Sequence, residues 1–91
     1  YPCTGTYPSR LHVGDQAYVS SDPPLSNRVR SQPNTSSEVL GYLEVGEKME
    51  ILEGPVCFGG WIWWRVRSLE KNLTGWTAEG DETAYWLVPL P

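Results

Sequence analysis

The chain has few of the residues that build metal sites or nucleophilic sites. Its 91 residues include one histidine, His12, and two cysteines, Cys3 and Cys57, which are far apart and form no CxxC motif. Structural zinc sites use closely spaced Cys and His pairs, so the usual zinc motifs are excluded. His12 has no Ser or Cys nucleophile pattern beside it, and no catalytic triad is expected. We predict no metal, no cofactor and no catalytic residue, and therefore a protein that is not an enzyme.

Clustered positive charge and long apolar runs are also missing. The net charge is −4, from seven basic and eleven acidic residues, and the arginines are scattered along the chain. Nucleic-acid binding needs grouped cations, so it is not expected. No apolar run reaches the 18 or so residues of a membrane-spanning helix, and no signal peptide or lipidation motif is present. The first residue is Tyr1 rather than Met, and we expect a mature fragment or one domain of a larger protein.

Helical periodicity is absent over any ten residues, whereas turn-forming residues are common, with nine Gly and eight Pro. Short alternating segments instead predict strands. These segments are residues 15–20, 28–31, 38–43, 48–53, 62–68 and 73–78. Residues 54–60 are expected to form a loop that contains Cys57. The predicted fold class is all-β, a small barrel of about five or six short antiparallel strands.

The two ends of the chain differ from its middle. Residues 1–14 are rich in turn formers and are expected to form an irregular N-terminal arm packed on the barrel, which would comprise residues 15–91. The segment 85–90 is apolar enough to dock on the barrel and close one end of it.

The two cysteines allow two interpretations, a disulfide or two inert buried thiols. We favour the disulfide, because Cys3 has no other evident role in a segment rich in Pro, Gly and Thr. In the chain-entropy model, closing such a loop stabilises the fold by at most about 4 kcal/mol. A disulfide would also place the protein in an oxidising compartment.

Tryptophan is concentrated in one region, with four of five indoles inside residues 61–76. Trp is a preferred anchor at binding surfaces, because its rigid ring buries a large area and its N–H still finds a partner. Strand alternation turns Trp64 toward the core and Trp63 to the opposite face. We expect Trp63 to be partly exposed or to line a groove; the alternative is that the arm or the tail covers it.

The other candidate ligand-binding residues are Trp61, Tyr85, Trp86 and Asp22. Trp61 follows two glycines and is expected at the surface, and the two aromatic residues of the tail are expected beside the groove. Asp22 could belong to an acidic rim with Glu79, Asp81 and Glu82. The plainer alternative is that these carboxylates are solvated loop charges.

Several motifs, in order, carry a resemblance to a known family. The segment Asn27-Arg28-Val29-Arg30-Ser31-Gln32-Pro33-Asn34-Thr35 and the following Val39-Leu40-Gly41 resemble the opening of bacterial SH3-like (SH3b) domains. The segments Trp63-Trp64-Arg65-Val66-Arg67 and Thr74-Gly75-Trp76-Thr77 resemble the final two strands of that family. Gln32 and Thr77 depart from the usual Gly and Val. The resemblance implies an SH3-like barrel.

A narrower resemblance is to an extracellular subgroup of these domains with a cysteine in the N-terminal arm. The runs Arg10-Leu11-His12-Val13-Gly14 and Gly54-Pro55-Val56-Cys57 carry it. This subgroup implies a pairing of Cys3 with Cys57 and a secreted or membrane-anchored parent protein.

The family resemblance implies a non-catalytic extracellular module that targets or anchors a larger protein at the bacterial cell envelope. The ligand would be a peptidoglycan peptide or glycan. The alternative is a structural protein–protein interaction domain in a cell-surface assembly. A binding module should hold its aromatic residues in a solvated cleft, whereas an assembly domain should expose a flat apolar patch.

Overall fold

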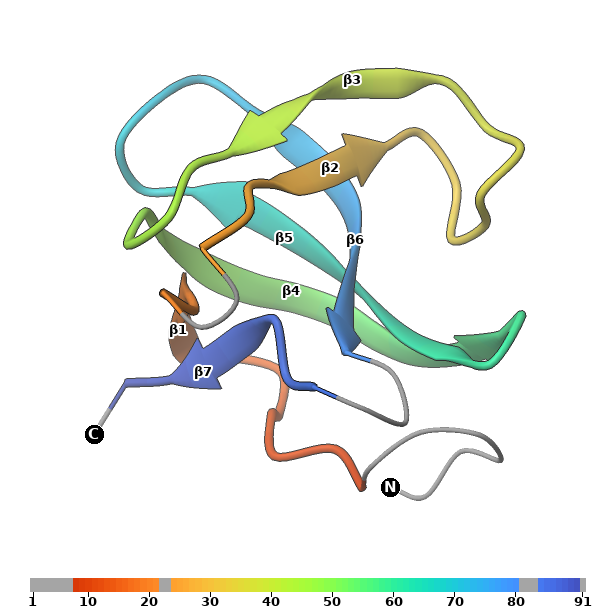
Figure 1. Ribbon diagram of the computed structural model, residues 1–91, viewed down its shortest axis with the longest axis horizontal. Coiled ribbons are helices and arrows are strands. Elements are labelled where there is room, and N and C mark those ends of the chain that lie inside the picture. The colour runs from red at the N-terminus through yellow and green to blue at the C-terminus, as the bar shows by residue number, and fades with distance from the viewer. Residues whose placement is uncertain (1–7, 22–23, 81–83, 91) are drawn as a thin grey trace.

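The computed structural model describes residues 8–21, 24–80 and 84–90 (Figure 1). All regular secondary structure in these ranges is β. The strands are β1 (Gln16–Val19), β2 (Asn27–Arg30), β3 (Val39–Leu43), β4 (Lys48–Phe58), β5 (Trp61–Ser68), β6 (Thr74–Gly80) and β7 (Leu87–Pro89).

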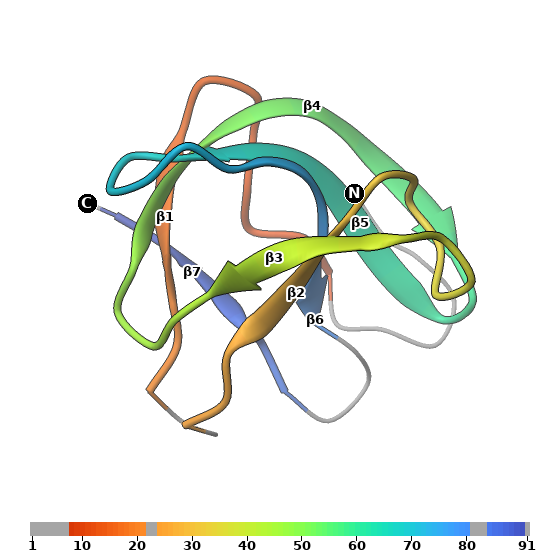
Figure 2. The same ribbon diagram turned by 90° about the horizontal axis from the view of Figure 1, so that it is seen from above.

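The strands form one antiparallel sheet in the order β3-β2-β6-β5-β4-β1-β7. Viewed from above, this sheet curls round so that β2 and β3 lie across from β1 and β7 (Figure 2). The predicted all-β, SH3-like fold class is confirmed. The described strands number seven instead of five or six, because the apolar tail pairs with β1 as an edge strand, with Ala17 opposite Pro89. Proline is tolerated on an edge, where its missing N–H breaks no ladder.

Alternation along the strands fills the inside of the curl. On β5, Ile62, Trp64 and Val66 are each at most 2% exposed, as their shared inward face predicts. Other strands supply small and branched side chains that complete the core. These are Ala17, Val19, Val29, Leu43, Met49, Ile51 and Leu87, and Leu11 before β1 joins them.

The hairpin of β4 and β5 is longer than predicted. A strand ending at Glu53 and a loop over 54–60 were expected, but β4 continues to Phe58 and only the tip at Gly59 and Gly60 turns. Register shifts near Glu53 and before Val56 accommodate the Gly54-Pro55 pair. The pair that looked like a strand end is thus an irregularity inside the strand. Cys57 therefore lies on β4, opposite Ile62, and not in a loop.

Gly54 is required where β4 crosses Trp64. Its φ is 126°, and a Cβ there would lie 2.9 Å from the Trp64 ring. Any other residue would be strained by the backbone and would collide with the indole. The absence of a side chain at Gly54 therefore makes room for the largest ring of the core.

Candidate functional site

A cleft of about 250 Å³ opens between the start of β2, the start of β5, β6 and the residue before β7. Its lining consists of Leu25, Ser26, Asn27, Arg28, Arg30, Trp61, Trp63, Thr77, Ala78 and Trp86. Strands that are distant in the sequence meet here, since β6 pairs with both β2 and β5. This volume lies just below the range of about 300–1,000 Å³ that is typical of small-molecule pockets, so the cleft suits only a very small ligand or a short segment of a larger one.

The floor of the cleft is held by side chains that join β2 to β6. The Thr77 hydroxyl donates to the Arg28 carbonyl at 2.9 Å, and the Asn27 amide donates to Thr77 Oγ1 and to the Ala78 carbonyl. Both side chains are buried, Thr77 completely. This explains why Thr stands where the resembled family usually has Val. The hydroxyl adds hydrogen bonds where the two strands share a single backbone register pair, Arg30 with Trp76.

Three indoles form the apolar wall. The Trp61 ring lies 5.6 Å from that of Trp63, tilted by 43°, and 5.3 Å from that of Trp86, edge-to-face at 88°. These arrangements are favourable for aromatic quadrupoles. Because successive rings are steeply inclined, they form a corner and not a flat platform. Trp61 was expected at the surface; it is the first residue of β5 and is half-buried.

Trp63 is more deeply covered than its position on the outer face suggested. The side chain lines the cleft but is only 2% exposed, because Trp61 packs against it. Its indole N–H donates to the Phe58 carbonyl at 3.1 Å, which fixes the ring across the hairpin tip. The expectation of partial exposure was therefore wrong, although the side chain does line the cleft.

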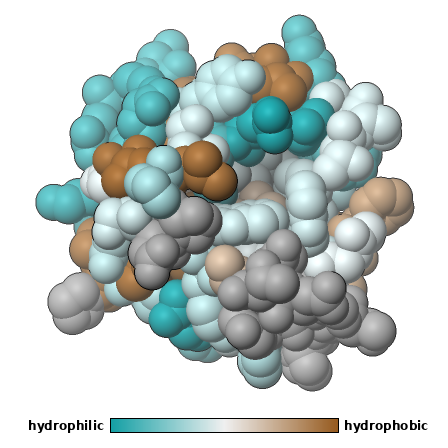
Figure 3. All heavy atoms as spheres, in the orientation of Figure 1, coloured by the Kyte–Doolittle hydropathy of each residue, from teal (hydrophilic) through white to brown (hydrophobic). Residues whose placement is uncertain are grey.

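The charged groups of the cleft are cationic. Arg28 is exposed and Arg30 is half-buried, and both line the cleft. No carboxylate occurs among the described lining residues. Figure 3 shows this face of the molecule, where strongly hydrophilic side chains over β2 border a paler hollow near the centre of the view. The charge of the cleft is therefore positive, opposite in sign to the net charge of −4.

Tyr85, predicted as a ligand contact, does not line the cleft. Its hydroxyl donates to the Pro8 carbonyl at 2.6 Å, and the Arg10 guanidinium lies 3.7 Å from the centre of its ring. Its neighbour Trp86 does reach the cleft. The tail thus contributes one aromatic residue to the cleft and uses the other to hold the arm.

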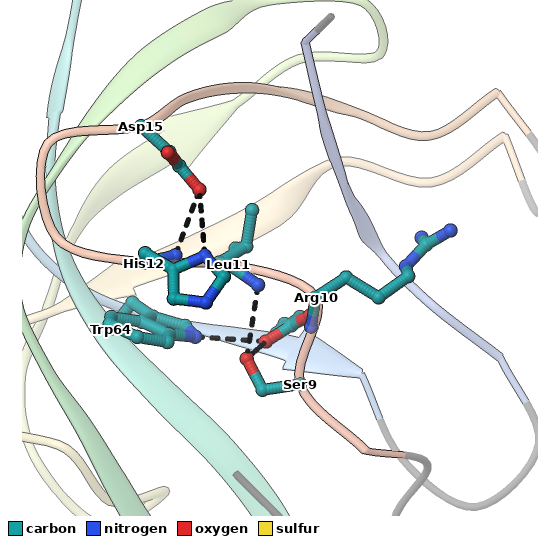
Figure 4. A network of polar contacts seen from close by, with 7 residues as sticks. Ser9, Arg10, Leu11, His12, Asp15 and Trp64 are labelled. Atoms are coloured by element: carbon teal, nitrogen blue, oxygen red, sulfur yellow. Dashed lines mark hydrogen bonds and ion pairs between the residues drawn. The ribbon is translucent and has the colours of Figure 1, made fainter.

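Glu79 corrects the predicted acidic rim. It is 1% exposed, and its carboxylate accepts hydrogen bonds from the Ser9 hydroxyl, the Arg10 amide and the Trp64 indole at 2.7–2.9 Å. Figure 4 shows the three donor residues, Ser9, Arg10 and Trp64, lying close together. The charge lies behind the core ring and not on a surface rim, because three donors replace its lost hydration. Asp22, Asp81 and Glu82, the other members proposed for the rim, lie outside the described residues.

Cys3, the predicted partner of Cys57, lies outside the described residues. Cys57 lies near the end of β4, on the hairpin that also carries Trp61. No free cysteine occurs in the ranges that the structure describes. The pairing of Cys3 with Cys57 remains a prediction.

A second buried carboxylate, Glu47, lies away from the cleft in the turn before β4. It accepts hydrogen bonds from the Ser68 hydroxyl at 2.6 Å and the Glu44 amide at 3.0 Å, and it pairs with Lys71 at 3.1 Å. Burial raises the pKa of Glu47, but the three donors outweigh it and hold the pKa below its ordinary value of 4.5. Glu47 is thus ionised and fixes the turn to the end of β5.

Sequence reasoning missed the polar part of the cleft. Arg28, Asn27 and Thr77 were seen only as positions in a family motif, yet they supply its charge and its floor. The sequence signal was Thr77 itself, a polar residue at a buried strand position.

His12, by contrast, is exposed and lies 3.5 Å from Asp15, so it has only a local surface contact. Within the described ranges, no group of three or more His, Cys, Asp or Glu could hold a metal ion.

The comparisons with known proteins agree with this architecture. Residues 25–83, more than half of the chain, match the family described as bacterial SH3 domain. No curated protein and no solved structure gives a significant match. In the part of the chain described, no helix is long and apolar enough to cross a membrane. A bacterial SH3 domain suggests a binding module. The curled antiparallel sheet and the family match together show that the chain belongs to the bacterial SH3 domain family.

Proposed function

We propose that the chain is a non-catalytic extracellular binding module that anchors a larger protein at the bacterial cell envelope. Its ligand is a peptidoglycan peptide or glycan, bound in the cleft between β2, β5 and β6. Membership of the bacterial SH3 domain family supports a binding role. The observation that carries the proposal is the cleft itself, with three indoles and two arginines among its lining residues.

The indoles are suited to hold a ligand. Trp61 and Trp86 are half-buried and so keep part of their surface available, while Trp63 supports Trp61 from beneath. Rings already packed against one another lose little freedom when a ligand binds, and this lowers the entropic cost of association. Polar groups at the edge would orient the ligand.

A non-catalytic role is supported by the state of the acidic and basic groups. General acid–base catalysis needs a titratable group within hydrogen-bond reach of the substrate. No described carboxylate or histidine lines the cleft, and Glu79 is occupied by three donors beneath the arm. Arginine stays protonated and transfers no proton at ordinary pH.

An extracellular location is part of the proposal and goes together with the disulfide. Linking Cys3 to Cys57 would tie the arm to the hairpin tip that carries Trp61, and it would require an oxidising compartment. Alkylation under denaturing conditions, followed by mass spectrometry with and without reduction, tests the link. Two alkylated thiols in the unreduced secreted protein would contradict it.

The binding role is tested by sedimenting the purified domain with insoluble peptidoglycan and recording indole NMR signals during titration with soluble muropeptides. Saturable binding is expected, with shifts at Trp61, Trp63 and Trp86. The signals of Trp64 and Trp76, which do not line the cleft, serve as internal controls. Absence of both sedimentation and shifts would overturn the proposal.

A second candidate function, a protein–protein interaction domain, is favoured by one observation. The edge strand β3 exposes Val39, Leu40 and Tyr42 by 37%, 45% and 46%. An exposed apolar edge strand is a common site of pairing with another chain. Light scattering over a range of concentrations tests self-association. A monomer at all concentrations that still binds peptidoglycan would leave the first function as the better account.

A further inference from the structure

The guanidinium of Arg28 is a charged group of the cleft to which the proposed function assigns no specific ligand contact. Resting on the proposed function, we infer that the ligand is a short peptide that presents a carboxylate to Arg28 and an adjoining apolar group to Trp61 and Trp86. The inference names the chemistry of the ligand and makes Arg28 a specificity-determining residue.

Arg28 differs from the four other arginines of the chain in its contacts. Each of the others has a partner: Arg10 stacks on Tyr85, Arg30 donates to the Ser37 carbonyl, Arg65 pairs with Glu53, and Arg67 pairs with Glu50. The Arg28 side chain forms no hydrogen bond, ion pair or ring contact with any described residue. Among the five arginines, the one without a side-chain partner in the described part of the chain is thus the exposed one in the cleft.

The backbone at Arg28 is nevertheless fixed. Its carbonyl accepts the Thr77 hydroxyl, and its Cα lies opposite Tyr42 on β3. The base of the side chain is therefore held, while its planar fork of donors remains available at the edge of the cleft. A guanidinium whose donors are available can bind a carboxylate through two parallel hydrogen bonds. Because no described lining residue is acidic, nothing in the described cleft competes for it.

The cleft favours a single anionic group over a polyanion. Only Arg28 and Arg30 supply positive charge there, and Arg30 already donates to Ser37. A polymer of phosphates is bound through several cations in succession, and the net charge of −4 would oppose it. One carboxylate beside one available guanidinium fits these charges better.

The arrangement of the rings favours a peptide over a sugar. Trp61 and Trp86 meet at 88°, and Trp61 and Trp63 at 43°, so no two rings form a continuous flat surface. Such a corner encloses a compact aliphatic or prolyl group on two sides, whereas the flat face of a sugar ring needs one open ring. The volume of about 250 Å³ admits only a short segment of a peptide.

The first test measures binding of purified sacculi by Arg28 variants. Arg28→Gln should weaken binding about tenfold, since a hydrogen-bonded charge pair is lost. Arg28→Lys, which keeps the charge but not the planar fork, should lose less. Arg65→Gln removes the same charge outside the cleft and should stay within about twofold of the unmodified chain, because it breaks only a surface ion pair. Equal binding by Arg28→Gln and Arg65→Gln would overturn the inference.

The second test changes the ligand. Sacculi whose carboxylates have been amidated with a carbodiimide and ammonia should bind about tenfold more weakly than untreated sacculi. Synthetic stem peptides amidated only at the C-terminus or only at the side-chain carboxyl then identify which carboxylate is read. Weaker binding of either the amidated sacculi or an amidated peptide supports the inference, and unchanged binding of both contradicts it.

Glycan strands freed of peptide by an amidase separate the remaining outcomes. Strong binding to these strands would overturn a peptide ligand while leaving a cell-wall role intact. If the unmodified chain binds neither untreated sacculi nor peptides, the proposed function itself fails. If it binds untreated and amidated sacculi equally, the proposed function stands and the inferred contact between a ligand carboxylate and Arg28 is wrong.

Discussion

The two sides of β5 carry adjacent tryptophans with the same exposure and different surroundings. Trp63 and Trp64 are each 2% exposed. Trp64 faces the core, and its N–H reaches the buried carboxylate of Glu79; Trp63 faces the cleft, and its N–H reaches a carbonyl of its own hairpin. Burial alone therefore does not separate a core residue from one that supports a site. The neighbours of each ring make that distinction.

The largest effect is expected on the core side of this comparison. Trp64→Ala removes the biggest ring of the core and leaves the Glu79 carboxylate with one donor fewer. The free energy of unfolding should fall by about 3–5 kcal/mol, as measured by urea denaturation. Trp63→Ala should cost less, because the space it leaves can open to the cleft and fill with water. If Trp63→Ala proves the more destabilising of the two, the distinction between the two sides of β5 fails.

The next effect concerns the polar partner of Trp64. Glu79→Gln places an amide NH₂ among three donors, so at least one hydrogen bond must be lost. Stability should fall by about 1–3 kcal/mol. Because the Arg10 amide donates to this carboxylate, hydrogen exchange at Arg10 should accelerate more than exchange in the middle of β5. Unchanged protection of that amide would show that the arm is held by other contacts.

On the cleft side the expected change is in binding and not in stability. Trp61→Ala should weaken muropeptide binding about tenfold or more, as is typical of an aromatic anchor. Phe58 is a matched control, since it pairs with Trp61 on the same hairpin, is 56% exposed and does not line the cleft. Binding by both variants is measured by fluorescence titration. Equal losses of affinity for Trp61→Ala and Phe58→Ala would place the ligand elsewhere.

The smallest effect is on the dependence of stability on pH, and it extends the comparison to the second buried carboxylate. The pKa of Glu47 is held below 4.5 in the folded state, so its ionised form stabilises the fold above that pH. This contribution is lost as the pH falls through the folded-state pKa. Thermal melts below pH 4.5 should therefore fall less steeply for Glu47→Gln than for the unmodified chain. Identical slopes would mean that Glu47 does not contribute.

The alternation of polar and apolar residues predicts much of this fold. It places Ile62, Trp64 and Val66 correctly on the inner face of β5, because one-sided burial imposes a period of two. It does not predict β7, a three-residue strand whose pairing depends on the finished curl of the sheet. The prediction from the sequence also ends β4 too early, because the Gly54-Pro55 pair inside the strand resembles a turn.

The site was harder to predict than the fold. Contact between Trp61 and Trp86 joins β5 to the tail, and no local pattern reports it. Glu79 looked like a loop charge because two of its three donors, Ser9 and Arg10, are about seventy positions away in the sequence. Tyr85 and Trp86 are adjacent, yet only the tertiary placement of the tail decides which of them reaches the cleft.

The Glu79 network also has a consequence for the order in which the chain can fold. Two of its three donors, Ser9 and Arg10, belong to the first part of the chain, and the acceptor belongs to the last strand but one, 70 and 69 positions away. Contacts of such separation close a very long loop and are typical of slow steps in β proteins. During synthesis, residues 8–11 emerge early and must wait until β6 has left the ribosome. Docking of these residues therefore marks a nearly complete domain.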